Sequence, residues 1–253
     1  MCPGVQTPGR SPADTIRIVR PLEIRNLGRM AYGDALALQR ALVADRQAKR
    51  IEDQLLLVEH PAVLTLGVRG DGGRSHILAT DEQLAERGIG VFETGRGGDV
   101  TYHGPGQIVG YPIVDLNPDR RDVHRYVRDI EEVLIRVAAD FGVTAQRISG
   151  LTGVWVDNEK LAAIGVRIQR WVTSHGFALN VSTNLHDFNL IVPCGISDRG
   201  VTSFARLGLS LTREQVEARI IARFAEVFER TPVVVTGEPR PAVAAAEDVQ
   251  AQP

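Results

Sequence analysis

The sequence predicts a mixed α/β domain in which strands come in pairs rather than in strict alternation with helices. Two long stretches, residues 123–141 and those from 212 onward, repeat apolar residues at spacings of three and four, which is typical of amphipathic helices. Short apolar or alternating runs that end at Gly, Pro or Asn predict strands. Several of these runs follow one another with only a turn between them, so the chain does not repeat a strand–helix–strand unit.

The first half of the chain begins with a predicted strand over 16–26, where apolar and polar residues alternate. A helix is predicted over 30–50, and its apolar face would comprise Ala35, Leu38, Leu42 and Val43. Strands are predicted over 55–59 and 63–68, separated by a His60-Pro61 turn. Residues 70–75 form a polar glycine loop. Thr80 can begin a short helix that runs to Gly88, because Gln83 completes a capping box.

The second half centres on the helix over 123–141, which is expected to end at Gly142. Strands are predicted near 154–157, 161–169 and 175–181, with a turn over 158–160. A last helix begins at Thr212, capped with Gln215, and turns Val216, Ile220, Phe224 and Val227 inward. A final strand covers 232–235. We expect residues 15–236 to form one domain, with a disordered lead-in over 1–14 and a disordered tail over 237–253.

Composition excludes several classes of protein. The 253 residues carry a net charge of −2, so neither nucleic acid nor an anionic membrane surface is an expected partner. No apolar run approaches the ~18 residues of a membrane span. The first thirteen residues lack the apolar core of a secretion signal. The two cysteines, Cys2 and Cys194, lie too far apart for a Cys-rich zinc site, and free thiols point to the cytoplasm.

A glycine-rich stretch predicts a pocket wall. It reads R-G-G-D-V-T-Y-H-G-P-G-Q-I-V-G-Y from Arg96 to Tyr111. The glycines disfavour a helix, and apolar anchors distinguish the stretch from a flexible linker. We expect a strand over 99–102, a turn over 103–106 and a strand over 107–114. Glycine lets backbone approach a ligand closely, which would place Arg96 and His103 beside one. The alternative is a structural hairpin with incidental glycines.

Two common glycine motifs do not fit this stretch. A phosphate-binding loop needs G-x-x-x-x-G-K-[ST], which occurs nowhere in the chain. A dinucleotide-binding loop needs G-x-G-x-x-G at the start of a helix. Here Gly104-Pro105-Gly106 is followed by residues that favour a strand. No spacing of His and Cys residues points to a metal, so no metal site is expected.

Lysine is scarce: of the 29 basic residues, 27 are arginines and only Lys49 and Lys160 are lysines. Lys49 lies in the polar R-Q-A-K-R end of a helix. Lys160 leads into the apolar run L-A-A-I-G-V, where a surface cation is the simplest interpretation. Unlike arginine, however, lysine can lose its proton when desolvated. Cys194 lies between Pro193 and Gly195, which indicates a turn, although a free cysteine is most often a small buried hydrophobe.

Three segments together resemble the octanoyltransferases of lipoate biosynthesis, which are octanoyl-[acyl carrier protein]:protein N-octanoyltransferases. They are R-G-G-x-x-T-Y-H-G-P-G-Q-x-V-G-Y-P-I from Arg96, K-L-A-A-I-G-V from Lys160, and P-C-G-I from Pro193. The resemblance runs from about Leu22 to about Val235. It implies the fold shared with biotin and lipoate protein ligases, a mixed central sheet flanked by helices. It also makes the predicted domain a catalytic acyltransferase domain.

The resemblance further implies a catalytic pair, with Cys194 as the nucleophile and Lys160 as the group that takes protons. It assigns substrate binding to three segments, Arg96–His103, Ala163–Gly165 and Gly176–Ala178. Their residues are Arg96, Gly97, Gly98, Asp99, Val100, Thr101, Tyr102, His103, Ala163, Ile164, Gly165, Gly176, Phe177 and Ala178. Asp99 occupies a variable position of the motif and receives no individual role. His103 and His175 are expected to be pocket residues.

The implied reaction takes octanoyl from octanoyl-acyl carrier protein and passes it, through a cysteine thioester, to a lysine of a lipoyl domain. The acceptors would be lipoyl domains of 2-oxoacid dehydrogenases and the glycine cleavage H protein, and no cofactor is expected. An ATP-dependent lipoate or biotin ligase of the same fold is the first alternative. A catalytically idle protein that binds acyl carrier protein is the second. A cysteine hydrolase fits less well, because no cysteine–histidine signature is present.

Overall fold

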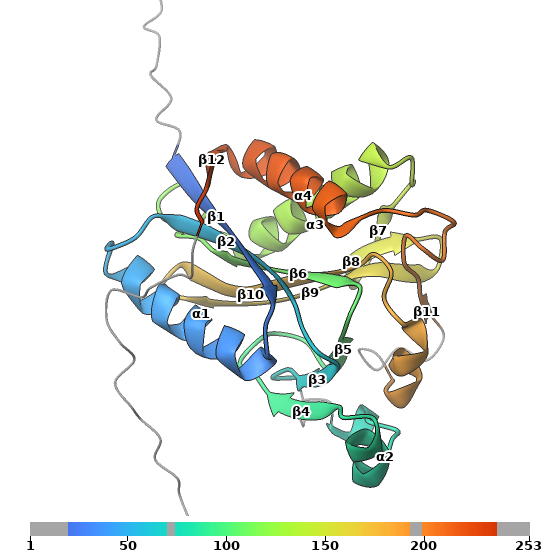
Figure 1. Ribbon diagram of the computed structural model, residues 1–253. Coiled ribbons are helices and arrows are strands. Elements are labelled where there is room, and N and C mark those ends of the chain that lie inside the picture. Colours follow the sequence, from blue (N-terminus) through green and yellow to red (C-terminus); the bar gives the residue numbers. More distant parts are fainter. Residues whose placement is uncertain (1–19, 70–73, 193–198, 237–253) are drawn as a thin grey trace, which may run out of the picture.

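The computed structural model describes residues 20–69, 74–192 and 199–236 (Figure 1). A large mixed sheet has the strand order β12-β1-β2-β6-β10-β9-β8-β7, and β11 pairs with β9 beyond this path. A smaller sheet has the order β4-β3-β5. The strands of the large sheet are β1 (Arg20–Arg29), β2 (Asp53–Glu59), β6 (Gln107–Ile113), β7 (Gln146–Ile148), β8 (Leu151–Val156), β9 (Glu159–Gln169), β10 (Val172–Asn180), β11 (Gly200–Val201) and β12 (Arg230–Val234). The smaller sheet contains β3 (Val63–Leu66), β4 (Gly90–Glu93) and β5 (Thr101–His103).

Helices cover both faces of the large sheet, as Figure 1 shows. On one face, α3 (Val123–Asp140) packs beside α4 (Arg213–Phe228), and on the other lies α1 (Tyr32–Gln47). A short α2 (Asp81–Glu86) adjoins the smaller sheet, and two 3-10 turns cover Arg74–His76 and Leu185–Leu190. This arrangement confirms the predicted mixed sheet flanked by helices.

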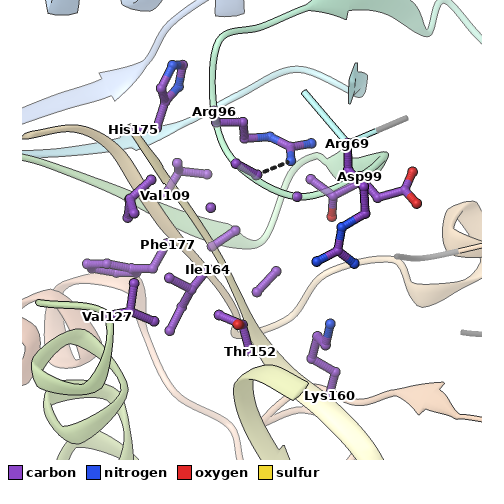
Figure 2. A pocket seen from close by; sticks show the side chains of 18 of the residues that line it. Arg69, Arg96, Asp99, Val109, Val127, Thr152, Lys160, Ile164, His175 and Phe177 are labelled. Carbon is purple, nitrogen blue, oxygen red and sulfur yellow. Dashed lines mark hydrogen bonds between the residues drawn. The ribbon is translucent and has the colours of Figure 1, made fainter. Parts of the chain in front are cut away.

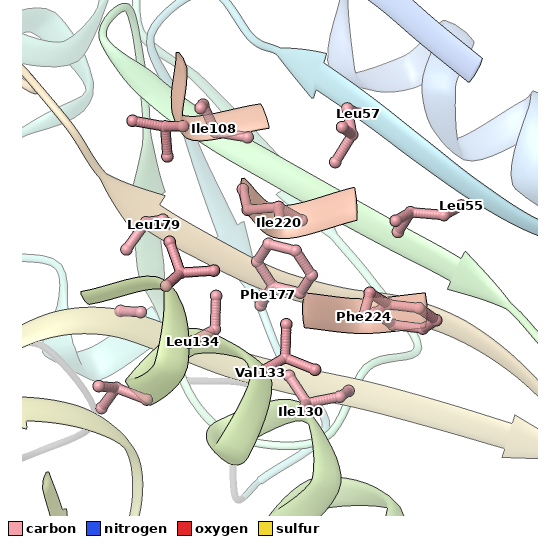
Figure 3. Close-up of a cluster of buried hydrophobic side chains, with 14 of the residues drawn as sticks. Leu55, Leu57, Ile108, Ile130, Val133, Leu134, Phe177, Leu179, Ile220 and Phe224 are labelled. Carbon is pink, nitrogen blue, oxygen red and sulfur yellow. The ribbon is translucent and has the colours of Figure 1, made fainter. Parts of the chain in front are cut away.

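The main core lies between the large sheet and the α3–α4 pair (Figure 3). Every third or fourth residue of α3 points into it, as the sequence predicts, and Ile130, Val133 and Leu134 are fully buried there. Phe224 stacks on Phe228 with ring centroids 4.1 Å apart. The opposite face has its own smaller core beneath α1, which includes Ala35, Leu42 and Val43. Burial of these two apolar surfaces provides the main driving force that holds the three layers together.

Helix ends follow the capping chemistry expected from the sequence. Thr80 with Gln83 and Thr212 with Gln215 form complete capping boxes, so both predictions are confirmed. Gly142 follows α3 with a φ of 77°, which ends the helix as predicted. Asp122, which the sequence analysis did not single out, caps the start of α3 by accepting from the Arg125 amide at 3.0 Å.

The glycine-rich stretch forms the predicted strand, turn and strand, but the two strands do not pair with each other. β5 pairs with β3 in the smaller sheet, whereas β6 pairs with β2 and β10 in the large sheet. The turn therefore carries the chain from one sheet to the other. Gly106 has a φ of 79°, and its carbonyl accepts from the amides of Val181 and Ser182. The turn is thus fixed to the end of β10.

One predicted turn is wrong, and the error concerns a candidate catalytic residue. The turn between β8 and β9 comprises residues 157–158 rather than 158–160, and Asp157 adopts a φ of 51°. Glu159 and Lys160 belong to β9. Their charged side chains suggested a turn, but in the structure they begin a strand. Other elements that the sequence did not predict are short: β4, β7, β11 and both 3-10 turns. The ends over 1–14 and 237–253, residues 16–19 and most of the polar loop lie outside the described residues.

Candidate active site

A cavity of about 390 Å³ opens between β9 and β10 of the large sheet, the loop that precedes β5 and the start of α3 (Figure 2). Most of the predicted substrate residues line it, although they come from three separate segments. Those in the lining are Arg96, Gly97, Gly98, Asp99, Thr101, His103, Ala163, Ile164, Gly165, Gly176, Phe177 and Ala178. Lys160 lines the same cavity, and so does His175. The fold therefore brings together residues that lie far apart in the sequence.

Val100 and Tyr102 are the two predicted substrate residues that do not line the cavity. Successive side chains of a strand point to opposite faces, so these two residues point into the core of the smaller sheet. The Tyr102 hydroxyl donates to the Asp187 carboxylate at 2.9 Å, and its ring meets Phe188 edge to face. Their side chains pack behind the cavity wall and do not form its surface.

One end of the cavity is apolar. Val109, Val127, Ile164 and Phe177 gather there from β6, α3, β9 and β10 (Figure 2). Val123, at the first turn of α3, also lines the cavity and is 47% exposed, so part of this apolar end is open to solvent. Such a surface suits an aliphatic chain rather than a charged group.

The other end carries cations. Figure 2 shows the side chains of Arg69 and Lys160 pointing toward one another. Lys160 is only 7% exposed, and its Nζ lies 4.7 Å from the centroid of the Trp155 ring. The Arg199 guanidinium lies over the same ring at 5.7 Å. The indole thus stabilises two positive charges, which is a cation–π arrangement.

Gly153 and Glu131 fix the strand beside Lys160. Gly153 on the adjacent β8 has a φ of 128°, and a Cβ there would lie 3.4 Å from Lys160 Cε and 2.8 Å from the Ala162 carbonyl oxygen. Glycine is therefore required here by its positive φ and by the close approach of the Ala162 carbonyl oxygen, while the lysine stem packs against it at ordinary contact distance. The Gly153 amide donates to the fully buried Glu131 carboxylate at 3.1 Å. Through this bond α3 fixes the strand that flanks Lys160.

Glycines bring backbone to the cavity surface. Gly165 of β9 pairs with Gly176 of β10, and Gly110 of β6 pairs with Phe177 next to them. A Cβ on Gly176 would overlap the Gly110 carbonyl, and one on Gly165 would lie 3.0 Å from the Gly97 carbonyl oxygen. The wall is therefore built from main chain packed too closely for side chains, which supports the predicted pocket wall.

Arg96 holds the loop that precedes β5. It is buried, and its Nη2 donates to the Thr65 carbonyl at 2.6 Å and to the Thr65 hydroxyl at 2.9 Å. The Gly97 amide donates to the Val166 carbonyl at 2.9 Å. The loop is thus tied to β3 on one side and to β9 on the other. Asp99, at its end, accepts from its own neighbour Val100 and contacts His76 at 2.8 Å.

His103 is a neutral histidine within a hydrogen-bond network. Burial lowers the pKa of His103 to about 3, and the neighbouring His60 adds to this effect. The Gln107 side chain donates through Nε2 to the Asn180 Oδ1 at 2.9 Å, so its Oε1 accepts from His103 Nδ1 at 2.8 Å. Asn180 in turn donates to the Thr202 carbonyl. His103 Nε2 is then left as an acceptor near the Thr65 hydroxyl, 3.4 Å away.

Several lining residues were missed from the sequence. Tyr32 of α1 contacts the site from a distant element, and burial raises its pKa to about 12. Arg69 also lines the cavity, and the sequence analysis assigned it no role there. Val123 and Val127 were recognised only as helix residues, and the other missed residues are Val109, Tyr111, Gly150, Leu151, Thr152 and Val166. The exposed apolar start of α3 was the one available signal.

Cys194 lies outside the described residues, which stop at Val192 and resume at Arg199. The Val192 amide donates to the His76 carbonyl at 2.8 Å, and His76 contacts the cavity residue Asp99. On the other side, Gly200 and Val201 pair with Glu159 and Lys160. Both described ends that border this segment therefore lie next to residues of the cavity.

The described residues contain neither a metal-binding cluster nor a membrane-spanning helix. No group of three or more His, Cys, Asp or Glu side chains in that part of the chain is arranged to hold a metal ion. No helix within the same ranges has the length and apolar character needed to cross a membrane.

Comparison with known proteins places the chain in a family. The lipoyl protein ligase A/B catalytic domain matches residues 31–225. An octanoyltransferase of Solibacter usitatus is 52% identical over 81% of this chain and 92% of its own length. An octanoyltransferase of Desulforamulus reducens is 48% identical over 85% of this chain and 94% of its own length.

Solved structures show the same fold at low sequence identity. Protein Ta0514 from T. acidophilum, solved with bound lipoic acid, matches with a TM-score of 0.71 and 14% identity, covering 85% of this chain and 90% of that one. Lipoate-protein ligase A bound with ATP matches with a TM-score of 0.64, also at 14% identity, covering 87% and 90%. The predicted lipoate ligase-like fold is confirmed. The chain belongs to the octanoyltransferases of the lipoyl protein ligase A/B catalytic domain family, acyltransferases that act in lipoylation.

Proposed function

We propose that this chain takes an octanoyl group from octanoyl-acyl carrier protein onto Cys194 and passes it to a lysine ε-amine of a lipoyl domain. The observation that carries this proposal is the cavity itself. A buried lysine, one of only two in the chain, lies at one end, and an apolar surface suited to an aliphatic chain lies at the other. The acceptors would be lipoyl domains of 2-oxoacid dehydrogenases and the glycine cleavage H protein.

In the first proposed step, Lys160 takes the proton of the Cys194 thiol and the thiolate attacks the thioester carbonyl of the donor. The bond from carbonyl carbon to carrier sulfur breaks, and the carrier sulfur leaves as a thiol after it receives that proton from Lys160, which is neutral again. Octanoyl is then held as a thioester on Cys194. The close-packed backbone around Gly165 and Gly176, here called the glycine wall, would hold the acyl chain. The cationic end of the cavity would stabilise negative charge on the carbonyl oxygen.

In the second step, the ε-amine of the acceptor lysine attacks the new thioester. Lys160 takes a proton from the amine as the carbon–nitrogen bond forms, and the Cys194 sulfur leaves. Lys160 must alternate between its charged and neutral forms to do this, a role in which arginine fails because it stays protonated. The pairing of Val201 with Lys160, and the contact of His76 with Asp99, support a position for Cys194 within reach of Lys160.

An ATP-dependent ligase remains the alternative, because lipoate-protein ligase A bound with ATP shares the fold. Two observations favour the transferase. The relatives at about half identity carry the name octanoyltransferase, whereas the ligase structures are 14% identical. The chain also lacks a phosphate-binding loop motif.

The test is intact mass after the protein is mixed with octanoyl-acyl carrier protein. We expect the mass of one octanoyl group to be added without nucleotide or magnesium, and hydroxylamine to remove it because it cleaves thioesters. Cys2→Ser is the matched control and should acylate normally. Acylation that persists as a thioester in Cys194→Ser would refute the assignment of the nucleophile. Strict dependence of product on ATP and free octanoate would instead identify a ligase.

A further inference from the structure

A second hollow, of about 170 Å³, lies between α1 and the ends of β9 and β10 that are far from Lys160. It shares only His175 with the main cavity. Its polar lining residues are Gln39, Arg40, Gln47, Arg167, Gln169, Ser174 and His175. Among the described residues that line it, none is Asp or Glu, so the charge that faces this space is entirely positive.

The two arginines of the hollow differ from most of those elsewhere in the fold. Arg46, Arg223 and Arg230, for example, all form ion pairs with carboxylates. Within the described ranges, neither Arg40 nor Arg167 makes a hydrogen bond or an ion pair. Both guanidinium groups therefore keep their donors available.

The Arg167 side chain packs against Gly95, a position that has no side chain of its own. A Cβ on Gly95 would overlap Arg167 Nη1, so the guanidinium lies directly against the Gly95 backbone. Gly95 has an ordinary negative φ region, as it is not among the residues with positive φ. Because the guanidinium is the far end of a flexible side chain, a larger residue at position 95 would displace it from this place. The sequence leaves space for a guanidinium at the edge of the hollow.

Two further donors in the hollow are deeply buried and lack partners. Gln39 is 1% exposed and His175 is 4% exposed, yet Gln39 Nε2 and His175 Nδ1 make no hydrogen bond. The Gln39 Oε1 accepts from the His175 amide at 2.8 Å, which fixes both residues relative to each other. Buried polar atoms are nearly always hydrogen-bonded, so these two atoms are suited to contact a polar ligand in the hollow. Figure 2 shows the His175 ring turned away from the other labelled residues of the main cavity.

The positive charges around His175 also favour a negatively charged ligand. Burial lowers the pKa of His175 to about 4, and Arg96, Arg167 and Arg40 lower it further through their positive charge. A bound anion would offset these three charges. The field therefore favours a negatively charged ligand in the hollow beside this histidine.

We propose that the second hollow binds a phosphate-class anion between Arg40 and Arg167, with Gln39 and His175 as additional donors. Four separate side chains line the space, so an anion whose oxygens are arranged tetrahedrally can be contacted from several sides. Inorganic phosphate offers four acceptor oxygens, a phosphodiester offers two unesterified oxygens besides its ester oxygens, and guanidinium groups bind both through paired hydrogen bonds. The anion is either inorganic phosphate or the phosphodiester of the donor carrier's pantetheine arm. Only the second source rests on the proposed function.

The probe is inorganic phosphate, titrated into the full chain at constant ionic strength with chloride as the balancing salt. The readout is the NMR signals of the His175 ring and of the arginine Nε–H groups. We expect saturable shifts and a rise in the pKa of His175, because the anion stabilises the imidazolium. Arg40→Gln and Arg167→Gln should each weaken binding about 10-fold or more, as expected for a lost charged hydrogen bond. Arg219→Gln, an exposed residue of α4 on the opposite face, should leave affinity unchanged.

Equal shifts with chloride alone would show simple screening and overturn the proposal. Wild-type affinity in both Arg40→Gln and Arg167→Gln would overturn it as well. Folding of each variant is checked by its melting temperature, and Arg167→Lys offers a second variant that keeps the charge. A second titration with pantetheine 4′-phosphate then identifies the source. Tighter binding than that of inorganic phosphate assigns the site to the prosthetic arm, and equal or weaker binding assigns it to the free ion. Neither titration depends on acyl transfer.

Discussion

Two buried neutral histidines should make the protein acid-sensitive, and the size of the effect follows from their burial. Burial holds the pKa of His103 at about 3 and that of His175 at about 4, whereas both approach 6.5 in the unfolded chain. Between these values the unfolded chain binds protons that the folded chain does not. Stability is therefore fully present above about pH 6.5 and is lost as the pH falls below it.

The magnitude can be worked out for a change from about pH 7.5 to about pH 5. A difference of one pH unit corresponds to about 1.4 kcal/mol for each group that is protonated only when unfolded. Over the ~1.5 units between 6.5 and 5, each histidine lowers the free energy of unfolding by about 2 kcal/mol. His60, whose pKa is also lowered by burial, acts in the same direction. A loss of about 4 kcal/mol is large beside the 5–15 kcal/mol that stabilises most domains.

The assay is urea unfolding at both pH values for the wild-type protein, His103→Gln and His175→Gln. Carboxylates also contribute to acid sensitivity, but their contribution cancels in the comparison of variants. Each variant should lose about 2 kcal/mol less than wild type between the two pH values, whatever its stability at neutral pH. The control is His124→Gln, because His124 is exposed at the start of α3. If both buried variants keep the full wild-type pH difference, the reasoning from burial is refuted.

Three further predictions test the site and the fold. Lys160→Arg keeps a cation but cannot exchange protons, so turnover should fall by about 10²–10⁴. Some alkylation of Cys194 by iodoacetamide should survive in this variant. Near-normal turnover would show that Lys160 acts only through its charge. Asp53→Asn should lower the free energy of unfolding by about 3–5 kcal/mol, because the buried Asp53 carboxylate accepts from two buried arginine side chains. A loss below about 1 kcal/mol in urea titrations would contradict this. Deletion of residues 1–13 and 237–253 should leave melting temperature and activity nearly unchanged, and a marked loss of either would show that an end packs on the domain.

Sequence periodicity was sufficient for the helices and for most long strands. The α3 pattern was clear because its apolar spacing matches the helical repeat and its ends carry capping residues. The short strands β4, β7 and β11 gave no such signal, because two to four residues cannot display a period. Their existence depends on partners elsewhere in the chain, as when β11 pairs with β9.

The site was predicted only as far as its motifs extend. The loop from Arg96 to His103 and the segments around Gly165 and Gly176 were singled out because each resembles a known motif, and the structure brings them to one cavity. Tyr32 and Val127 reach the cavity through helix packing, and no local pattern encodes that contact. Val100 and Tyr102 were assigned by the motif alone, whereas strand alternation points them to the opposite face.

The glycine wall has a practical consequence for anyone who maps this site by mutation. Alanine scanning finds functional residues by removing atoms, but at Gly110, Gly165 and Gly176 an alanine adds one. The new methyl group would meet a ring, a loop or a neighbouring strand, so a loss of activity there would report a distorted cavity rather than a lost contact. Of these three glycines, Gly165 and Gly176 line the cavity, and neither has a side chain to delete. Their contribution can be measured only from the substrate side, by altering the acyl chain one methylene at a time.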